Sequence, residues 1–225
     1  MKPEPAKERQ EPGTLVCFAL DREAAPFRKM AGDLPGVSIL VTGPGAKNAE
    51  ASLRRFLAAH PPRLVFSCGF AGGLNPDLKA GDVLFEPGHP PSATRLSEGR
   101  LRAAGARPAR FFCADRVATT VADKKKLRDQ TGADAVEMES AAIHAVCAER
   151  GIPCATVRVI SDAADEALPL DFNRLAKPDL GIDWGKLAWA VAQRPGTIPA
   201  LMELRRKTRF AAAQLAAVLA KIISP

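Results

Sequence analysis

The stretch AVEMESAAIHAVCAERGIPCATVRVISDAAD, residues 135–165, decides the fold class. Apolar residues follow Ser140 as in a helix, and serine is a favoured residue at a helix start. Gly151 and then Pro153 end this helix. The next residues, Cys154 to Ile160 (CATVRVI), are apolar and β-branched, which predicts a buried strand. The stretch therefore predicts a strand–helix–strand unit, which is typical of α/β folds.

Strands and helices alternate along the rest of the chain. We expect further strands at residues 14–20, 37–42, 64–68 and 81–86 and from residue 111, and helices at residues 21–30, 46–59, 123–131, 184–192 and 198–223. This order predicts a three-layer α/β/α sandwich around a mostly parallel, mixed sheet. We expect residues 14–225 to form one domain with a C-terminal helical extension from about residue 184, after a disordered polar tail at residues 1–13.

Two glutamates stand at the junction before the helix. Glu137 and Glu139 flank Met138, so an extended backbone would direct both carboxylates to one face and the methionine to the other. An ionised carboxylate can accept bonds from both hydroxyls of a cis-diol such as that of ribose. The alternative is that the acids complement the helix dipole. We favour the diol for Glu139 and the dipole for Glu137, while keeping both as candidates for substrate binding.

Asp162 stands where the apolar strand ends. An acid that is partly removed from water at such a position tends to keep its proton and can act as a proton donor, and the adjacent Ser161 can orient it. The alternative is that Asp162 caps the next segment, and Asp165 has the same ambiguity.

Other unusual segments fall where expected strands end, the edge of an α/β sheet at which ligands bind. They are Asp21-Arg22-Glu23, Gly43-Pro44-Gly45 and Gly69-Phe70-Ala71-Gly72-Gly73. Backbone N–H groups of the segment 69–73 can hold an anion or water, and the alternative is a tight turn without a ligand. Neither segment is a GxGxxG or Walker sequence, so a dinucleotide or nucleoside triphosphate site is poorly supported.

Composition limits the possible partners. The net charge of +7 permits an anionic partner, but the aromatic and basic interleaving that stacks bases is missing, so we expect no nucleic acid. The five cysteines form no CxxC pair, and no apolar run is long enough to span a bilayer, which predicts a cytoplasmic protein with free thiols. The three histidines form no ligand cluster, so we expect no metal, and nothing indicates an organic cofactor.

Four motifs in order, GPGAKNAEASL, CGFAGGLNPDLKAGDV, VEMESAA and RVISDAAD, resemble the purine nucleoside phosphorylase superfamily, and most of all its methylthioadenosine/S-adenosylhomocysteine nucleosidases. The resemblance runs from about residue 15 to about residue 165. It implies a nucleoside phosphorylase-like fold and cleavage of the N-glycosidic bond of a purine nucleoside, with adenine as the expected base. It also implies a homodimer or higher oligomer.

The resemblance assigns roles to five residues. Glu139 matches the glutamate that binds the ribose hydroxyls, and Met138 matches the methionine that packs on the sugar. Asp162 matches the acid that protonates the purine at N7, with Ser161 beside it. Glu23 matches the glutamate that activates water in the nucleosidases. The bond broken leaves positive charge on the ribose and negative charge on the base, so acids on both sides suit the reaction, as in glycosidases.

The base-binding region is also implied by the resemblance. Val117 and Ala118 fall where family members hold the base. Phe70 stands where the nucleosidases carry a serine, so it cannot supply a hydroxyl and is expected to line an apolar part of the pocket, with Ala71 and Gly72, or simply to pack beneath it.

The C-terminal segment RPGTIPALMELRRKTRFAAAQLAAVL, with GFAGGLNP and DAADEALP, resembles the hopanoid-associated phosphorylases, which act on an adenosyl lipid. Its apolar and basic residues permit a membrane-surface helix, and the alternative is a helix packed on the domain. The bond acceptor stays open: Glu23 favours water, and phosphate is possible as a co-substrate. A non-catalytic nucleoside-binding protein on the same fold is the remaining alternative.

Overall fold

A computed structural model describes residues 13–31, 34–87, 98–177 and 179–223. The tail expected at residues 1–13 lies almost wholly outside the described residues.

The described strands form one eight-stranded mixed sheet. Its main path runs β2-β1-β3-β8-β4-β5, while β7 pairs with β3 and β6 pairs with β7. Strands β2, β1, β3 and β8 run parallel to one another, whereas β4 is antiparallel to β8 and β7 is antiparallel to β3. The strands are β1 (Thr14–Phe18), β2 (Val37–Val41), β3 (Leu64–Gly73), β4 (Val83–Glu86), β5 (Arg107–Pro108), β6 (Phe111–Cys113), β7 (Ala135–Glu137) and β8 (Cys154–Asp162).

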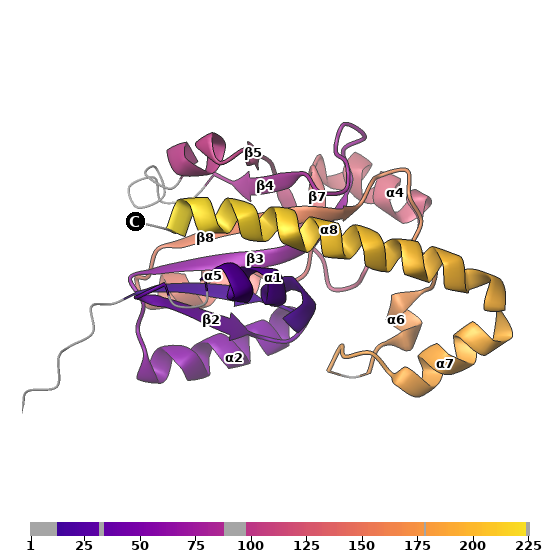
Figure 1. The fold of residues 1–225 in the computed structure, drawn as a ribbon, viewed down its shortest axis with the longest axis horizontal. Helices are drawn as coiled ribbons and strands as arrows, with labels where there is room; N and C mark the ends of the chain where they lie inside the picture. The colour runs from indigo at the N-terminus through magenta and orange to yellow at the C-terminus, as the bar shows by residue number, and fades with distance from the viewer. Residues whose placement is uncertain (1–12, 32–33, 88–97, 178, 224–225) are drawn as a thin grey trace, which may run out of the picture.

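Helices cover both faces of this sheet, as Figure 1 shows. Helices α1 and α8 pack together on one face, and α2 and α5 pack together on the other. The described helices are α1 (Asp21–Ala31), α2 (Ala46–Ala59), α4 (Val121–Thr131), α5 (Ser140–Glu149), α6 (Phe172–Leu175), α7 (Trp184–Gln193), the 3-10 turn η1 (Pro195–Thr197) and α8 (Ile198–Ile223), with residues 98–103 also helical. The expected α/β/α arrangement around a mixed sheet is confirmed.

Helix α8 packs on the sheet through its C-terminal half. Ala211, Leu215, Val218 and Ile222 recur at helical spacing and are all buried in the same cluster as the α1 side chains. The stripe that permitted a membrane-surface helix is therefore used for the core in this half, where burying each large side chain stabilises the fold by about 2 kcal/mol. No helix among the described residues is long and apolar enough to cross a membrane.

Strand β3 is longer than expected. The strand continues from Cys68 through Gly73, pairing with β8 and, at its end, with β7. The segment 69–73 is thus part of the sheet, and the expected glycine loop with free N–H groups is wrong. Glycine is needed at Gly69 because φ is +151° there and an added Cβ would lie 2.8 Å from the Arg158 guanidinium and 3.0 Å from the Glu23 carboxylate.

Candidate active site

Arg158 is the centre of a buried charge cluster. It lies in the middle of β8, where every residue is buried, and its side chain is 1% exposed. The guanidinium forms an ion pair with Glu137 and donates through Nη1 to Glu139 Oε2 at 3.2 Å. A buried guanidinium is tolerated only when it is paired in this way. Both glutamates therefore face the same side, as the alternating sequence predicted.

Glu139 lies between the sheet and the turn after β2. Its Oε1 accepts the N–H of Gly45 at 2.9 Å, so it joins two strand ends that are 94 residues apart in sequence. Burial raises the pKa of Glu139 above its ordinary value, and the neighbouring Arg158 only partly opposes that rise. Glu139 is also the N-cap of α5, which begins at Ser140, although its side chain makes no capping hydrogen bond.

Glu137 does not lie free to meet a substrate. Its carboxylate accepts the N–H groups of Glu139 and Ser140 at 3.0 and 2.8 Å and the Ser140 hydroxyl at 2.6 Å, and it pairs with Arg158. Burial alone would raise the pKa of Glu137, but Arg158 and these bonds outweigh burial and lower it. These contacts favour a role for Glu137 at the start of α5, which is the alternative preferred from the sequence, and its substrate-binding role stays a prediction.

Glu23 lies in the first turn of α1 with 3% of its surface exposed. It accepts the N–H of Leu20 at Oε2 and the N–H of Phe70 at Oε1, both at 2.9 Å. Burial raises the pKa of Glu23 to about 7, and the charge of Glu139 contributes to the rise. A carboxyl group with this pKa can gain and lose a proton near neutral pH, as a general base must.

Asp162 ends β8, and both of its carboxylate oxygens are held. The Ser161 hydroxyl donates to Oδ1 at 2.5 Å, which is the orienting contact expected from the sequence. The ammonium of Lys124 lies 2.5 Å from Oδ2. Gly72 lies beside this pair, and an added Cβ there would be in ordinary contact with Oδ2 at 3.4 Å.

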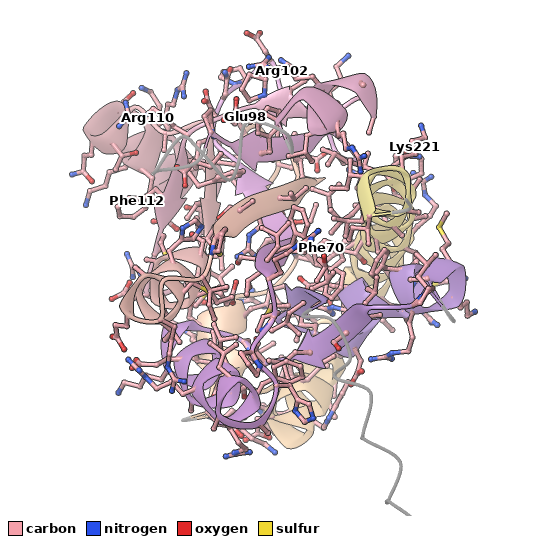
Figure 2. All side chains as sticks on the ribbon, turned by 90° about the vertical axis from the view of Figure 1, so that its left-hand side faces the viewer. Phe70, Glu98, Arg102, Arg110, Phe112 and Lys221 are labelled. Carbon is pink, nitrogen blue, oxygen red and sulfur yellow. The ribbon has the colours of Figure 1, made fainter. Side chains whose placement is uncertain are left out.

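The remaining predicted residues lie around these acids. Phe70 is half-buried and packs on the cluster formed by α1 and α8, with the Arg22 guanidinium 6.0 Å from its ring centre. In Figure 2, Phe70 lies beside the central strands, on the side of α8. Ala71 is buried in β3, and Met138 is half-buried beside Glu139.

Val117 is held by a short helix beyond the sheet. Its N–H donates to Asn173 Oδ1 and its carbonyl accepts from Asn173 Nδ2, both at 2.9 Å. A second contact joins the same segment to α2, where Asn48 donates to the Asp179 carbonyl at 2.6 Å. Residues 171–183, with α6, therefore contact both the 117 turn and the start of α2, beyond the carboxyl ends of the strands (Figure 1).

Sequence reasoning missed three residues that shape this region. Arg158 was included in an apolar strand, although a lone arginine in such a strand between acidic turns is a usable signal for a buried ion pair. Lys124 belongs to a run of three lysines, and nothing in that run separates the buried one from its exposed neighbours. Asn173 stands in a polar segment and carries no signal of its own.

Other features concern cysteines and metals. All five cysteines are free thiols. Within the residues that the structure describes, no group of three or more His, Cys, Asp or Glu side chains is placed to hold a metal ion.

Fold and site together define a class: an α/β protein that gathers buried acids at the carboxyl ends of its central parallel strands. The chain belongs to the phosphorylase superfamily, whose model matches residues 22–85 and 91–181. The family resemblance carried by the four motifs is thereby confirmed.

The relatives of this chain include two 5′-methylthioadenosine/S-adenosylhomocysteine nucleosidases. That of Exiguobacterium sp. is 26% identical over 207 residues, which cover 78% of this chain and 88% of the relative. That of Geobacillus kaustophilus is 30% identical over 176 residues, which cover 64% of this chain and 74% of the relative. Both are nucleosidases, the class of enzyme that the motifs predict.

Solved structures show the same fold. The Helicobacter pylori 5′-methylthioadenosine/S-adenosylhomocysteine nucleosidase with butyl-thio-DADMe-Immucillin-A has a TM-score of 0.69 at 19% identity and covers 94% of this chain and 97% of its own. The nucleosidase of Neisseria meningitidis with methylthio-immucillin-A has a TM-score of 0.67 at 21% identity, covering 94% and 98%.

Proposed function

We propose that this protein is a nucleosidase that cleaves the N-glycosidic bond of an adenine nucleoside substituted at the 5′ position. The observation that carries the proposal is the separation of three buried acids into three environments. Glu23 has a pKa of about 7, Glu139 is held against Arg158 and Gly45, and Asp162 is held by Ser161 and Lys124. Acids kept in different environments perform different steps of one reaction.

Each acid has one role in the proposed reaction. Asp162 gives a proton to N7 of the purine, so that the base leaves as a neutral molecule when the bond to the ribose breaks. Glu139 accepts the ribose hydroxyls and stabilises the positive charge that builds on the sugar. Glu23 takes a proton from the attacking water.

Water is the acceptor that this arrangement favours over phosphate. Glu23 has the pKa that a general base needs near neutral pH. The two arginines near it are engaged elsewhere, since Arg22 lies against the Phe70 ring and Arg28 pairs with Asp21 at 3.4 Å. Phosphate therefore is not expected to stimulate the reaction.

The proposal also includes the compartment, the oligomeric state and the domain organisation of the enzyme. We expect a cytoplasmic homo-oligomer in which residues 14–225 form a single domain, and the five free thiols suit a reducing compartment. Light scattering after size exclusion tests the oligomer, and limited proteolysis tests the single domain.

The deciding experiment measures adenine released from 5′-methylthioadenosine with and without phosphate, followed by a panel of adenine nucleosides with longer 5′ groups. Release without phosphate, at an unchanged rate when phosphate is added, is the expected result. A rate that depends on phosphate would make the enzyme a phosphorylase. Binding of nucleosides without release of any base would instead support the non-catalytic alternative.

A further inference from the structure

Lys124, on α4, is a lysine whose side chain has no exposed surface. Its ammonium lies 2.5 Å from Asp162 Oδ2 and donates to the carbonyl oxygens of Ala163 and Glu166 at 2.6 and 2.8 Å. An ammonium has three N–H donors, so these three acceptors use all of them. Burial of a charged ammonium costs several kcal/mol, and it is tolerated here because each donor has a partner.

The other charged groups near Lys124 have partners of their own, so its ammonium pairs with the carboxylate of Asp162. The nearby carboxylate of Glu166 has its own cation, because Lys207 on α8 lies 2.6 Å from Glu166 Oε1. The adjacent charged residues of α4 are turned outward: Asp123 bonds to Thr120, and Lys125 pairs with Asp129.

We propose that Lys124 is a positioning residue for Asp162, an inference that rests on the proposed nucleosidase function. Lys124 fixes the direction of the carboxyl group together with Ser161. In the reaction, the protonated form of Asp162 passes its proton to purine N7, and the electron pair of the broken bond goes to the base, which leaves as a neutral molecule. Asp162 is then a carboxylate, and the Lys124 ammonium at Oδ2 stabilises that charge.

The inference predicts an effect that depends on the leaving group. Purine departure needs the proton that Asp162 supplies, so loss of Lys124 should slow it. A 4-nitrophenyl riboside releases a phenolate that leaves without a proton, so loss of Lys124 should hardly affect it. If Lys124 only stabilised the fold, its loss would slow the cleavage of both substrates by the same factor, because both reactions depend alike on the amount of folded enzyme.

The test compares Lys124→Met, Lys124→Arg and Lys124→Gln with the exposed control Lys125→Met. With 5′-methylthioadenosine, Lys124→Met should lower kcat about 100-fold, the cost of a misplaced reacting group, with little change in KM. Lys124→Arg keeps the charge and should recover part of kcat, and Lys125→Met should behave as wild type.

Three results separate the possible failures. An equal loss of kcat on the purine nucleoside and the nitrophenyl riboside in Lys124→Met would overturn the role of Lys124 while the nucleosidase function stands. If Lys124→Met does not fold, Lys124→Gln, which keeps donors without charge, carries the same comparison. A wild-type protein that releases adenine from no nucleoside would overturn the proposed function itself.

Discussion

The buried carboxyl group of Glu23 should make the free energy of unfolding depend on pH. The substitution Glu23→Gln should remove this contribution. Its pKa is about 7 in the folded protein and 4.5 as the ordinary value, so the folded state holds the proton more tightly. Stability from this difference is fully present below pH 4.5 and is lost as the pH rises through 7. The two pKa values differ by about 2.5, and at about 1.4 kcal/mol for each unit the whole effect is about 3.5 kcal/mol.

The assay compares wild type with Glu23→Gln in urea at several pH values, followed by far-UV circular dichroism. Between about pH 5 and pH 8 the linkage relation gives a loss of about 2.5 kcal/mol in the wild type that the glutamine variant lacks. Absolute stability is not compared, because glutamine can accept only one of the N–H bonds from Leu20 and Phe70 without placing its amide against the other. The difference in pH dependence isolates the carboxyl group.

The control is Glu50→Gln, which removes a carboxylate from the surface of α2. It should leave the pH dependence of the wild type in place. Glu139, whose pKa is also raised, contributes to the slope of every variant, and because its charge interacts with Glu23 the comparison reports Glu23 together with this interaction. Parallel curves for wild type and Glu23→Gln would show that the carboxyl group ionises normally, and the proposed general base would then lose its physical support.

Three further substitutions test the site. Asp162→Asn should lower kcat for adenine release by about a hundred-fold or more while substrate binding, measured by calorimetry, is nearly kept, and an active variant would contradict the acid role. Arg158→Met should cost about 3–5 kcal/mol in urea unfolding because Glu137 and Glu139 would be left buried without their cation, and a stability within error of wild type would argue against the cluster. Gly69→Ala places a Cβ 2.8 Å from the Arg158 guanidinium and should cost about 1–3 kcal/mol, whereas the control Gly99→Ala, with nothing within 4 Å, should not.

The order of helices and strands was accessible from the sequence because each rests on local pattern. Apolar spacing and end signals placed α2 and α8 at the residues where the structure has them. The end of β3 was not accessible, because glycines at a strand end ordinarily indicate a turn. Here they stay in the sheet because Gly69 makes room for side chains from α1 and β8, which is a tertiary reason.

The sequence identified the candidate site residues that stand at strand ends. It did not identify their interaction partners, which are distant in the sequence. Glu23, Glu139 and Asp162 were identified from their positions and from the motifs, and their catalytic roles remain predictions. The direction of a side chain was harder to predict: Glu137 has the same sequence setting as Glu139, yet it is used up by Arg158 and Ser140. Lys124 lies 38 positions from Asp162, and only folding brings the two together.

The positions of the two tryptophans determine which part of the protein its intrinsic fluorescence reports on. Both stand on α7, where Trp184 and Trp189 are 71% and 68% exposed, and the chain contains no tyrosine. Intrinsic fluorescence therefore follows one peripheral helix and is blind to the sheet, so a melting curve recorded by emission would describe the detachment of α7. The same helix follows residues 171–183, which contact Val117 through Asn173, so its emission also reports on the end of that segment.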